Sequence, residues 1–534
     1  MAAPAPGQGQ RPTVWPFALA VGLVALHAAP FAVVGDMSLL PGDAGGILLA
    51  AAPAAFLWLA VVGGLCLAGR PWVGTVVVAL PAVATWWVEA PFVPPLSSPP
   101  EVATRRADPP LVLLTLDTLR ADHLGAVSGK PITPHLDALA RRGVLFVDGV
   151  SPAPLTGPAH VGLLTGREPT DVGVLRNGHP LPADVPTVAE RLSAAGWRTG
   201  AFVASQVLDR RAGFQRGFTH YDDRMSASHH LAGWGPWAAL ATHDWLDVPS
   251  QRRGDEVVDR TLAWLGDDPT GTFVWVHLYD AHSPYRAERR PDLAPAEVGE
   301  PDDLATWSAW RTKWFESRRP FAKKKDDRVR EEVERYAADV HELDRIVGRL
   351  VAAMPADTRW VVAADHGESL TEHGYTMNHG RHVFQATLRV PLVVVDGARA
   401  SAPVEHPVPS WLTAHTVAHL GGLDADGPTL LDYVEAPYVA PIRSFTTGQE
   451  ARRRFGLERR APELAVRDGD TKWLVAGAER HWRFDLASDP QEREPTIEPN
   501  PQQHGELERI MGLVDLTDAD ADEMRWLQAL GYVD

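Results

Sequence analysis

The stretch PLVLLTLDTLRADHLG, residues 110–125, decides the fold. Its first half is a continuous apolar run, which is typical of a strand buried on both faces of a sheet, and Asp117 follows this run directly. A second stretch, RWVVAADHGE at 359–368, repeats the arrangement and carries Asp365 and His366 after its apolar run. Because ligands of α/β proteins bind at the carboxyl ends of the strands, both stretches predict polar site residues at one edge of a buried sheet.

Apolar runs and amphipathic helical patterns alternate along the chain after residue 110. This alternation predicts an α/β fold in which a mostly parallel sheet carries helices on both faces. The expected strands are 111–116, 144–147, 199–204, 273–278, 360–364 and 391–395, and the expected helices are 134–142, 188–195 and 328–354. The charged and weakly periodic segment 286–327 is expected to form a surface insertion.

The composition limits the possible functions. The chain has 534 residues, of which 45% are hydrophobic, so it can form two or three globular units with a large core. Its formal net charge of -17 argues against a nucleic-acid partner, since phosphates require a basic face. Cys66 is the single cysteine, which excludes a disulfide or a thiolate metal cage within one chain. A bound metal would therefore be held by oxygen and imidazole.

Three long apolar stretches precede the first strand, at about 14–34, 45–68 and 72–93. Each is long enough to cross a bilayer, which takes about 20 residues. Arg11 and Arg70 flank these stretches on one side, and the positive-inside rule makes that side cytoplasmic. The sequence therefore predicts three transmembrane helices in a multi-pass protein of the cell membrane, with the globular part on the extracytoplasmic side. A cleaved signal peptide is the alternative interpretation of the first stretch.

Between the two acidic strand ends lies SPAPLTGPAHVGLLTGREP, residues 151–169. Thr156 precedes a short helix whose first turn carries Pro158, as first turns often do. Its hydroxyl would lie at a helix N-terminus, where free amides and the helix dipole favour an anion. A neutral hydroxyl is a weak nucleophile unless a base or metal withdraws its proton, and the acidic strand ends could hold that metal. The alternative is that Thr156 only caps the helix and that the acids are solvated strand ends.

These motifs resemble the sulfatase family of the alkaline phosphatase superfamily. TGPAHVGLLTGREP at 156–169 resembles the nucleophile signature of that family, and LDTLRADHLG at 116–125 resembles its first metal-binding strand. The other similar motifs are TPHLDALARRGVLF at 133–146, HLYDAHSPY at 277–285, ADHGESLTEHG at 364–374, NHGRHVFQATLRVPLVV at 378–394, DTKWLV at 470–475, RFDLASDPQE at 483–492 and LQALGYV at 527–533. So many motifs in the expected order are far more specific than any single one.

The resemblance implies an alkaline phosphatase-like fold completed by a small C-terminal antiparallel sheet. With the features above, it predicts four segments. These are a membrane anchor at 1–95, a linker at 96–109, a sulfatase-like catalytic domain at 110–400 and a C-terminal subdomain at 401–534.

The resemblance also implies a divalent metal ion, with Asp117, Asp365 and His366 as ligands and with Thr156 coordinating it. The identity of the ion stays open among Ca, Mn, Zn and Mg. Thr118 stands where sulfatases usually have a second metal-binding aspartate, and this departure weakens the case for a calcium site of the sulfatase type.

Further catalytic roles follow from the same resemblance. His160 falls where many members have the arginine that steadies the nucleophile, and His282 and His379 fall near positions that contact the transferred group or the leaving oxygen. A second metal ion could be held by Asp280 together with His282 and His379. Three other histidines could line the cleft but are more typical of surface positions: His341, His373 and His382.

The nucleophile departs from the sulfatase pattern, because Thr156 cannot become the formylglycine aldehyde that sulfatases make from Cys or Ser. It instead resembles the unmodified Thr of phosphoryl-transfer members of the superfamily. The predicted function is therefore a membrane-anchored, metal-dependent hydrolase or transferase that acts on phosphate esters of envelope lipid or glycan. The alternatives are a sulfuric ester hydrolase that lacks formylglycine, and a catalytically inactive binding protein at the membrane surface.

Overall fold

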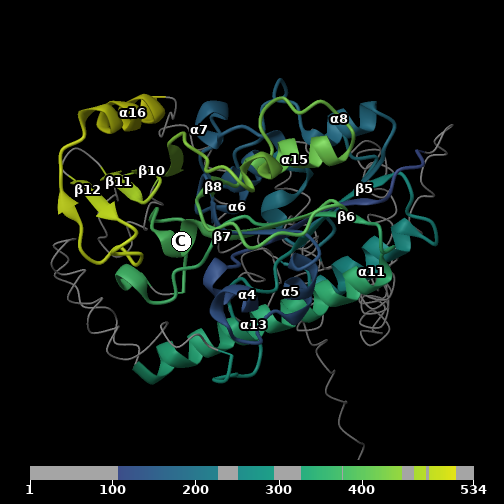
Figure 1. Ribbon diagram of the computed structural model, residues 1–534, viewed down its shortest axis with the longest axis horizontal. Helices are drawn as coiled ribbons and strands as arrows, with labels where there is room; N and C mark the ends of the chain where they lie inside the picture. Colours follow the sequence, from purple (N-terminus) through teal and green to yellow (C-terminus); the bar gives the residue numbers. More distant parts are fainter. Residues whose placement is uncertain are drawn as a thin grey trace, which may run out of the picture. The chain divides into compact units, whose positions relative to one another are not determined.

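The computed structural model describes residues 106–225, 251–293, 326–375, 377–447, 462–476 and 480–512. All of these residues belong to one compact unit of the chain. This unit contains a large sheet covered by helices and a smaller sheet near the C-terminus (Figure 1).

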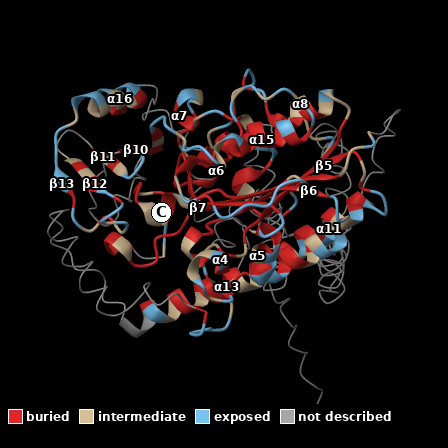
Figure 2. Ribbon diagram, viewed as in Figure 1, coloured by how far each residue is buried: buried red, intermediate tan, exposed pale blue. Residues whose placement is uncertain are grey.

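The large sheet has eight strands in the order β4-β3-β5-β1-β6-β7-β2-β8. The central strands β5, β1 and β6 are parallel and are buried along almost their whole length (Figure 2). The strand bounds are β1 Leu111–Leu116, β2 Val144–Val150, β3 Arg198–Phe202, β4 His220–Asp222, β5 Thr272–Leu278, β6 Arg359–Ala364, β7 Arg389–Val395 and β8 Val408–Pro409. All six predicted strands are present.

The sheet is mixed, which corrects the predicted mostly parallel fold class. β7 runs antiparallel to both of its neighbours, β6 and β2. The connection between β6 and β7 contains only the short helices η5 (Glu372–Gly374) and α14 (Gln385–Leu388), and it lacks the long α-helix that usually carries the chain across a sheet face between parallel strands. Buried antiparallel and buried parallel strands have the same continuous apolar run, so the sequence pattern did not distinguish them.

Helices cover both faces of the large sheet (Figure 1). On one face, α5 contacts β7, and α11 contacts β5 and β3; on the other, α15 contacts β6 and β1, and α8 contacts β3. The α-helix bounds are α4 Gly125–Ser128, α5 Pro134–Ala140, α6 Thr156–Thr165, α7 Pro169–Val172, α8 Val188–Ala194, α11 Gly254–Leu265, α13 Asp326–Ala353, α14 Gln385–Leu388, α15 Leu412–Leu420 and α16 Pro501–Gly512. The 3-10 helices are η2 Ala121–His123, η3 Gln206–Leu208, η4 Arg210–Ala212, η5 Glu372–Gly374 and η6 Leu430–Tyr433.

The smaller sheet is antiparallel, with the strand order β13-β12-β11-β10-β9. One of its faces packs on Val383, Phe384 and Leu388, which lie in the segment between β6 and β7. The other face packs on α16. The strand bounds are β9 Ile442–Thr446, β10 Glu463–Asp468, β11 Thr471–Ala476, β12 Arg480–Asp485 and β13 Thr496–Ile497.

Buried charges connect the smaller sheet to the segment between β6 and β7. Lys472 Nζ lies 2.5 Å from Glu492 Oε1 and donates to Val383 O at 2.6 Å. Glu492 Oε2 accepts the N–H of Gln385 at 2.6 Å. Both charged side chains are almost completely buried. The C-terminal region therefore holds a segment that, as shown below, carries site residues.

The predicted membrane part of the fold class is wrong for the fold that the structure describes. Among the described residues, no helix combines the length and hydropathy needed to cross a bilayer. The three stretches at 14–34, 45–68 and 72–93 lie outside these residues. The prediction rested on apolar run length and on the flanking arginines, and no helix in the described part of the chain bears it out. With it, the multi-pass location in the cell membrane is withdrawn, and envelope lipid or glycan loses its support as the substrate.

The buried ion pair of the C-terminal region should dominate the stability of that region. The substitution Lys472→Met leaves Glu492 buried without its counter-charge, and we expect the free energy of unfolding to fall by about 3–5 kcal/mol. Arg509→Met, which removes an exposed partner of Glu506, is the control and should cost less than about 1 kcal/mol. Urea unfolding followed by fluorescence measures both. Equal losses in the two variants would contradict the role given to Lys472.

Candidate active site

Two buried carboxylates lie at the centre of the large sheet. Asp117 follows β1 and Asp365 follows β6, and Leu116 is paired with Ala364 in the register of these neighbouring strands. Neither carboxyl group is exposed. Burial raises the pKa of both, and the proximity of Asp117 raises that of Asp365 further. Two such groups destabilise the protein when both are ionised, unless a positive charge lies near them.

The turn after β1 has a left-handed backbone. Thr118 has a φ of 57°, which is rare for a β-branched residue. Its N–H donates to Asp365 Oδ1 at 3.2 Å. Its carbonyl accepts from the hydroxyl of Tyr336 at 2.7 Å, and this hydroxyl accepts the N–H of Arg120 at 3.1 Å. Thr118, which replaces an expected ligand, thus contributes its backbone to the site by orienting Asp365.

Thr156 is the first residue of α6 and is fully buried. Its Oγ1 lies 3.4 Å from Asp117 Oδ2 and 3.4 Å from His366 Nε2. Free backbone amides were expected at this helix start. One of them, the N–H of Gly157, is not free, because it donates to Asn177 Oδ1 at 2.8 Å. The hydroxyl is therefore the polar group that this helix start presents to the carboxylates.

Asp117, Asp365 and His366 have ligand atoms that all lie within 4.8 Å of one another. Oδ1 of Asp117 and Oδ2 of Asp365 have no hydrogen-bond partner among the residues that the structure describes. His366 Nδ1 donates to Gly367 O at 3.0 Å, so Nε2 is the ring nitrogen left for a metal ion, and it lies 3.6 Å from Asp365 Oδ2. Carboxylate and imidazole donors suit Zn²⁺ and Mn²⁺. These residues therefore fit a divalent metal ion.

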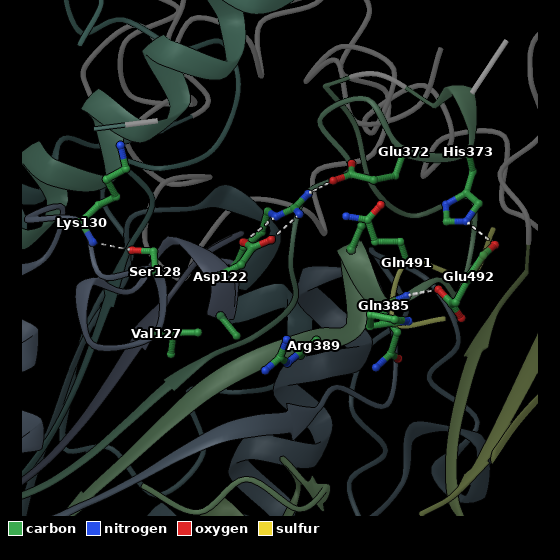
Figure 3. A pocket seen from close by; sticks show the side chains of 14 residues that line it. Asp122, Val127, Ser128, Lys130, Glu372, His373, Gln385, Arg389, Gln491 and Glu492 are labelled. Carbon is green, nitrogen blue, oxygen red and sulfur yellow. Dashed lines mark hydrogen bonds and ion pairs between the residues drawn. The ribbon is translucent and has the colours of Figure 1, made fainter. Parts of the chain in front are cut away.

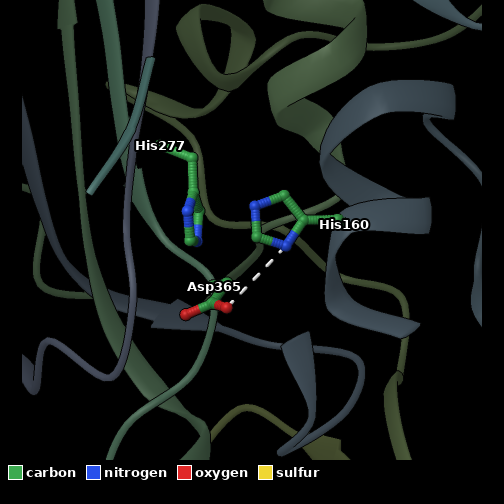
Figure 4. Close-up of side chains that lie close together, drawn as sticks. All are labelled: His160, His277 and Asp365. Atoms are coloured by element: carbon green, nitrogen blue, oxygen red, sulfur yellow. Dashed lines mark ion pairs between the residues drawn. The ribbon is translucent and has the colours of Figure 1, made fainter. Parts of the chain in front are cut away.

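A second group of close ligand atoms, His160, His277 and Asp365, has a different explanation (Figure 4). His160 Nδ1 donates to Thr156 O at 2.8 Å, and its Nε2 accepts from the Thr115 hydroxyl at 3.2 Å. Burial lowers the pKa of His160 to about 3, so the ring is neutral. Both ring nitrogens are used, and His160 therefore fixes the start of α6 and does not act as a metal ligand.

His277, near the end of β5, is a site residue that the sequence analysis missed. Its Nδ1 accepts the N–H of Ala204 at 3.4 Å, which places the ring proton on Nε2. Nε2 lies 3.4 Å from Asp117 Oδ2. Outer partners of this kind hold metal-binding carboxylates in position. The sequence signal that could have identified His277 was the occurrence of a histidine within the apolar run of a strand.

His282 and His379 lie side by side, with ring centroids 4.8 Å apart, and the ring of His379 lies 4.4 Å from that of His366. His379 Nδ1 is 3.2 Å from Oε1 of the buried Glu368, a second residue that the sequence analysis missed. Burial lowers the pKa of His282 to about 4 and raises that of Glu368 to about 7. The structure thus brings both predicted histidines next to Asp117, Asp365 and His366. The sequence signal that could have identified Glu368 was its position directly after the motif DHG.

The remaining candidates have partners elsewhere. Asp280 accepts the N–H of Gly254 at 3.0 Å at the start of α11. No group of close ligand atoms within the described ranges includes Asp280, so the second metal set that it was to form is not present there. The three remaining histidines also have structural contacts: His341 Nδ1 with Ile132 O at 2.8 Å, the ring of His373 on that of Phe384 at 3.6 Å, and His382 Nδ1 with Glu463 Oε1 at 2.8 Å.

Two cavities lie near these residues. The first, of about 430 Å³, is lined by Arg120, Glu372 and Glu492 among others (Figure 3). The second, of about 460 Å³, is lined by Tyr279 and His282 among others. His282 also belongs to the row of site histidines, so it is the residue that the second cavity shares with the candidate site.

Comparison with known proteins gives consistent matches. The Sulfatase family model matches residues 109–423. An ulvan-active sulfatase from Formosa agariphila is 25% identical over 354 residues, which cover 62% of this chain and 65% of that protein. A choline-sulfatase from Rhizobium meliloti is 24% identical over 408 residues, which cover 67% of this chain and 76% of that protein. The crystal structure of the phosphonate monoester hydrolase of Agrobacterium radiobacter has the same fold, with a TM-score of 0.56 and 21% identity over 76% of this chain and 95% of that one.

Metal binding is expected to depend on Asp365. An ion at 100 times its dissociation constant should raise the free energy of unfolding by about 2.7 kcal/mol. The substitution Asp365→Asn removes a ligand and should abolish most of this rise. In metal-free protein at neutral pH, the same substitution should leave the stability equal or higher, because it removes a buried charge. Thermal unfolding after chelation, with and without Mn²⁺, Zn²⁺, Ca²⁺ or Mg²⁺, measures both effects.

The matched control is Asp344→Asn. Asp344 is equally buried but accepts the N–H groups of His135 and Leu136 at the start of α5. This variant should lose stability in metal-free protein and keep the rise caused by the ion. A full metal-dependent rise in Asp365→Asn would contradict the ligand assignment.

Proposed function

The chain belongs to the sulfatase family of the alkaline phosphatase superfamily, a family of ester hydrolases, and on this premise we propose that it is a metal-dependent phosphoric ester hydrolase with Thr156 as the nucleophile. The observation that carries the proposal is the position of Thr156 Oγ1, 3.4 Å from both Asp117 Oδ2 and His366 Nε2. A buried hydroxyl among metal-binding groups has the surroundings that an alcohol needs in order to become a nucleophile.

The unmodified hydroxyl favours a phosphate over a sulfate ester. Thr156 carries a methyl group on its β-carbon and cannot be converted to the formylglycine aldehyde of sulfatases. A sulfate ester is the second candidate, because both relatives described above are named as sulfatases.

The reaction follows from the residues around Thr156. Its Oγ1 would form a bond to phosphorus while the bond from phosphorus to the leaving oxygen breaks, and water would then hydrolyse the phosphothreonine and restore the hydroxyl. A divalent ion held by Asp117, Asp365, His366 and Thr156 would lower the pKa of the hydroxyl and shield the charge on the equatorial oxygens. His160 would keep the backbone of Thr156 in position through its hydrogen bond to Thr156 O.

We assign the leaving oxygen to the side of His282 and His379. Burial is the main cause that lowers the pKa of both rings, so at neutral pH each carries one proton, and in His282 this proton lies on Nδ1, which donates to Ser283 O at 2.6 Å. Glu368 lies 3.2 Å from His379 Nδ1 and would orient that ring. When the Glu368 carboxyl carries a proton and donates it to His379 Nδ1, the single proton of that ring lies on Nε2, and His379 would donate it to the departing oxygen.

Covalent trapping tests the nucleophile. With a slow phosphate ester, rapid acid quenching and intact-mass measurement should detect one phosphoryl adduct, and peptide mapping should localise it to the peptide that carries Thr156. If the ester is turned over but no phosphoryl adduct forms at any time, either on the intact protein or on the Thr156 peptide, the result would argue for direct attack of water on the ester.

Substitution of the same residue gives an independent test. Thr156→Ala should lower kcat by at least about 10³-fold, as removal of a nucleophile does in other enzymes. Thr165→Ala, in the last turn of the same helix, is the control; the Thr165 hydroxyl donates to Val161 O and accepts the N–H of Arg167, both away from the site, and its loss should change kcat less than about twofold. Wild-type activity in Thr156→Ala would refute the proposal.

Relative rates on matched esters decide between the two substrate classes. A series of aryl phosphates, aryl phosphodiesters and aryl sulfates with one common leaving group should show the highest kcat/KM for a phosphoric ester. A higher kcat/KM for the aryl sulfate would establish the second candidate in its place.

A further inference from the structure

The cavity beside His282 has a wall that carries arginines. His282 stacks on Tyr279 in this wall, with ring centroids 4.2 Å apart. Arg253 and Arg286 line the same cavity and are exposed. A leaving group of an ester at Thr156 that passes beside His282 would extend into this cavity. The side chains of the wall would therefore contact the part of the substrate that lies beyond the reacting ester.

The guanidinium groups of Arg253 and Arg286 are available for a ligand. Arg252, their neighbour in the wall, is buried and pairs with Asp222 at 2.9 Å. Arg253 and Arg286, in contrast, form no salt bridge and donate no side-chain hydrogen bond within the part of the chain that the structure describes. Unpaired guanidinium groups in a concave wall are suited to bind phosphate or sulfate oxygens.

Four acidic residues line the same wall: Asp280, Asp339, Glu288 and Glu342. Glu342 pairs with Arg345 at 2.7 Å, and Glu288 forms no salt bridge with Arg253 or Arg286 within the described residues. Asp339 accepts the N–H groups of Arg286 and Ala287, each at 2.8 Å, and Asp280 accepts a backbone N–H at the start of α11. Burial raises the pKa of both carboxyls to about 6, although Arg253 and Arg286 attract them. Their oxygens are thus occupied by backbone groups, and their charge is reduced near pH 6.

The cavity in Figure 3 has a different balance of charge. There, Arg120 is paired with Asp122 and lies 2.8 Å from Glu372 Oε1. Glu492 of the same wall is paired with Lys472. Arg120 and Glu492 are therefore already paired within the protein; Lys130 and Arg389 also line that cavity, but neither His282 nor His379 does. The cavity beside His282 is the one that shares a residue with the candidate site.

We propose that the cavity beside His282 is a subsite for a second oxyanion on the leaving-group side of the substrate, and that Arg253 and Arg286 bind it. The second group is a phosphate or a sulfate, and the substrate is thus an ester whose leaving alcohol carries an additional anionic group. This inference rests on the proposed function, because it takes the reacting ester to lie at Thr156.

A matched pair of ligands tests the subsite. The probes are 1,4-butanediol monophosphate and 1,4-butanediol bisphosphate, which share the reacting ester and differ only in the remote phosphate. By calorimetry, we expect the metal-loaded Thr156→Ala protein to bind the bisphosphate about tenfold more tightly than the monophosphate, because two exposed charge contacts together contribute about this much. High salt should reduce this preference, because exposed charges are screened. The corresponding mono- and bissulfates show whether the subsite accepts sulfate equally.

The double variant Arg253→Gln/Arg286→Gln should bind the mono- and the bisphosphate with equal affinity. Arg399→Gln removes the same kind of charge from an exposed site beside Asp396 and should keep the tenfold preference. Equal affinity for the two probes in the protein with both arginines, or an unchanged preference in the double variant, would overturn the subsite.

Turnover by the unsubstituted enzyme separates this inference from the proposed function. If neither phosphate nor sulfate is released from any probe while calorimetry still shows the preference, the proposed function fails and the anion subsite stands. If inorganic phosphate is released from both probes with the same kcat/KM and calorimetry shows no preference, the subsite fails and the proposed function stands.

Discussion

The electrostatic repulsion between two buried carboxylates, Asp117 and Asp365, is the constraint on which the site depends. The strands that carry them are adjacent and parallel, so the register of the sheet places both at the same edge. Burial raises the pKa of both groups, which means that the folded chain holds their charge at a cost in stability. His277 and the backbone of Thr118 each lie against one carboxylate. A divalent ion would relieve the remaining repulsion and bring Thr156 into its coordination sphere.

The sequence could predict the parts of this site that depend on strand ends. An apolar run followed by an acid was sufficient to locate Asp117 and Asp365, and the first of these runs matches β1 residue by residue. The metal group that the resemblance implies, with Thr156 beside it, is brought together in the structure. Asp280 was misassigned because an acid that accepts a backbone N–H has the same appearance in a sequence as one that faces a cation.

Other features could not be predicted because they depend on contacts between distant segments. The direction of β7 is set by the path of the chain after β6, which an apolar run does not record. His277 and Glu368 became site residues only when β5 and the DHGE turn were placed beside Asp117 and His379. Within the described residues Arg253 and Arg286 form no salt bridge, and for Arg286 this likewise depends on Asp339 of α13, which directs its oxygens to backbone N–H groups.

The smaller sheet has a consequence for how the protein matures in the cell. The segment between β6 and β7 carries His379, and it is held by Lys472 and Glu492, which occur about a hundred residues later in the chain. During synthesis on a ribosome, domains fold as their residues emerge, but this segment lacks its buried ionic support until the residues around Glu492 have left the exit tunnel. The nascent chain can therefore form the large sheet early and fix the segment that carries His379 only after the smaller sheet has emerged.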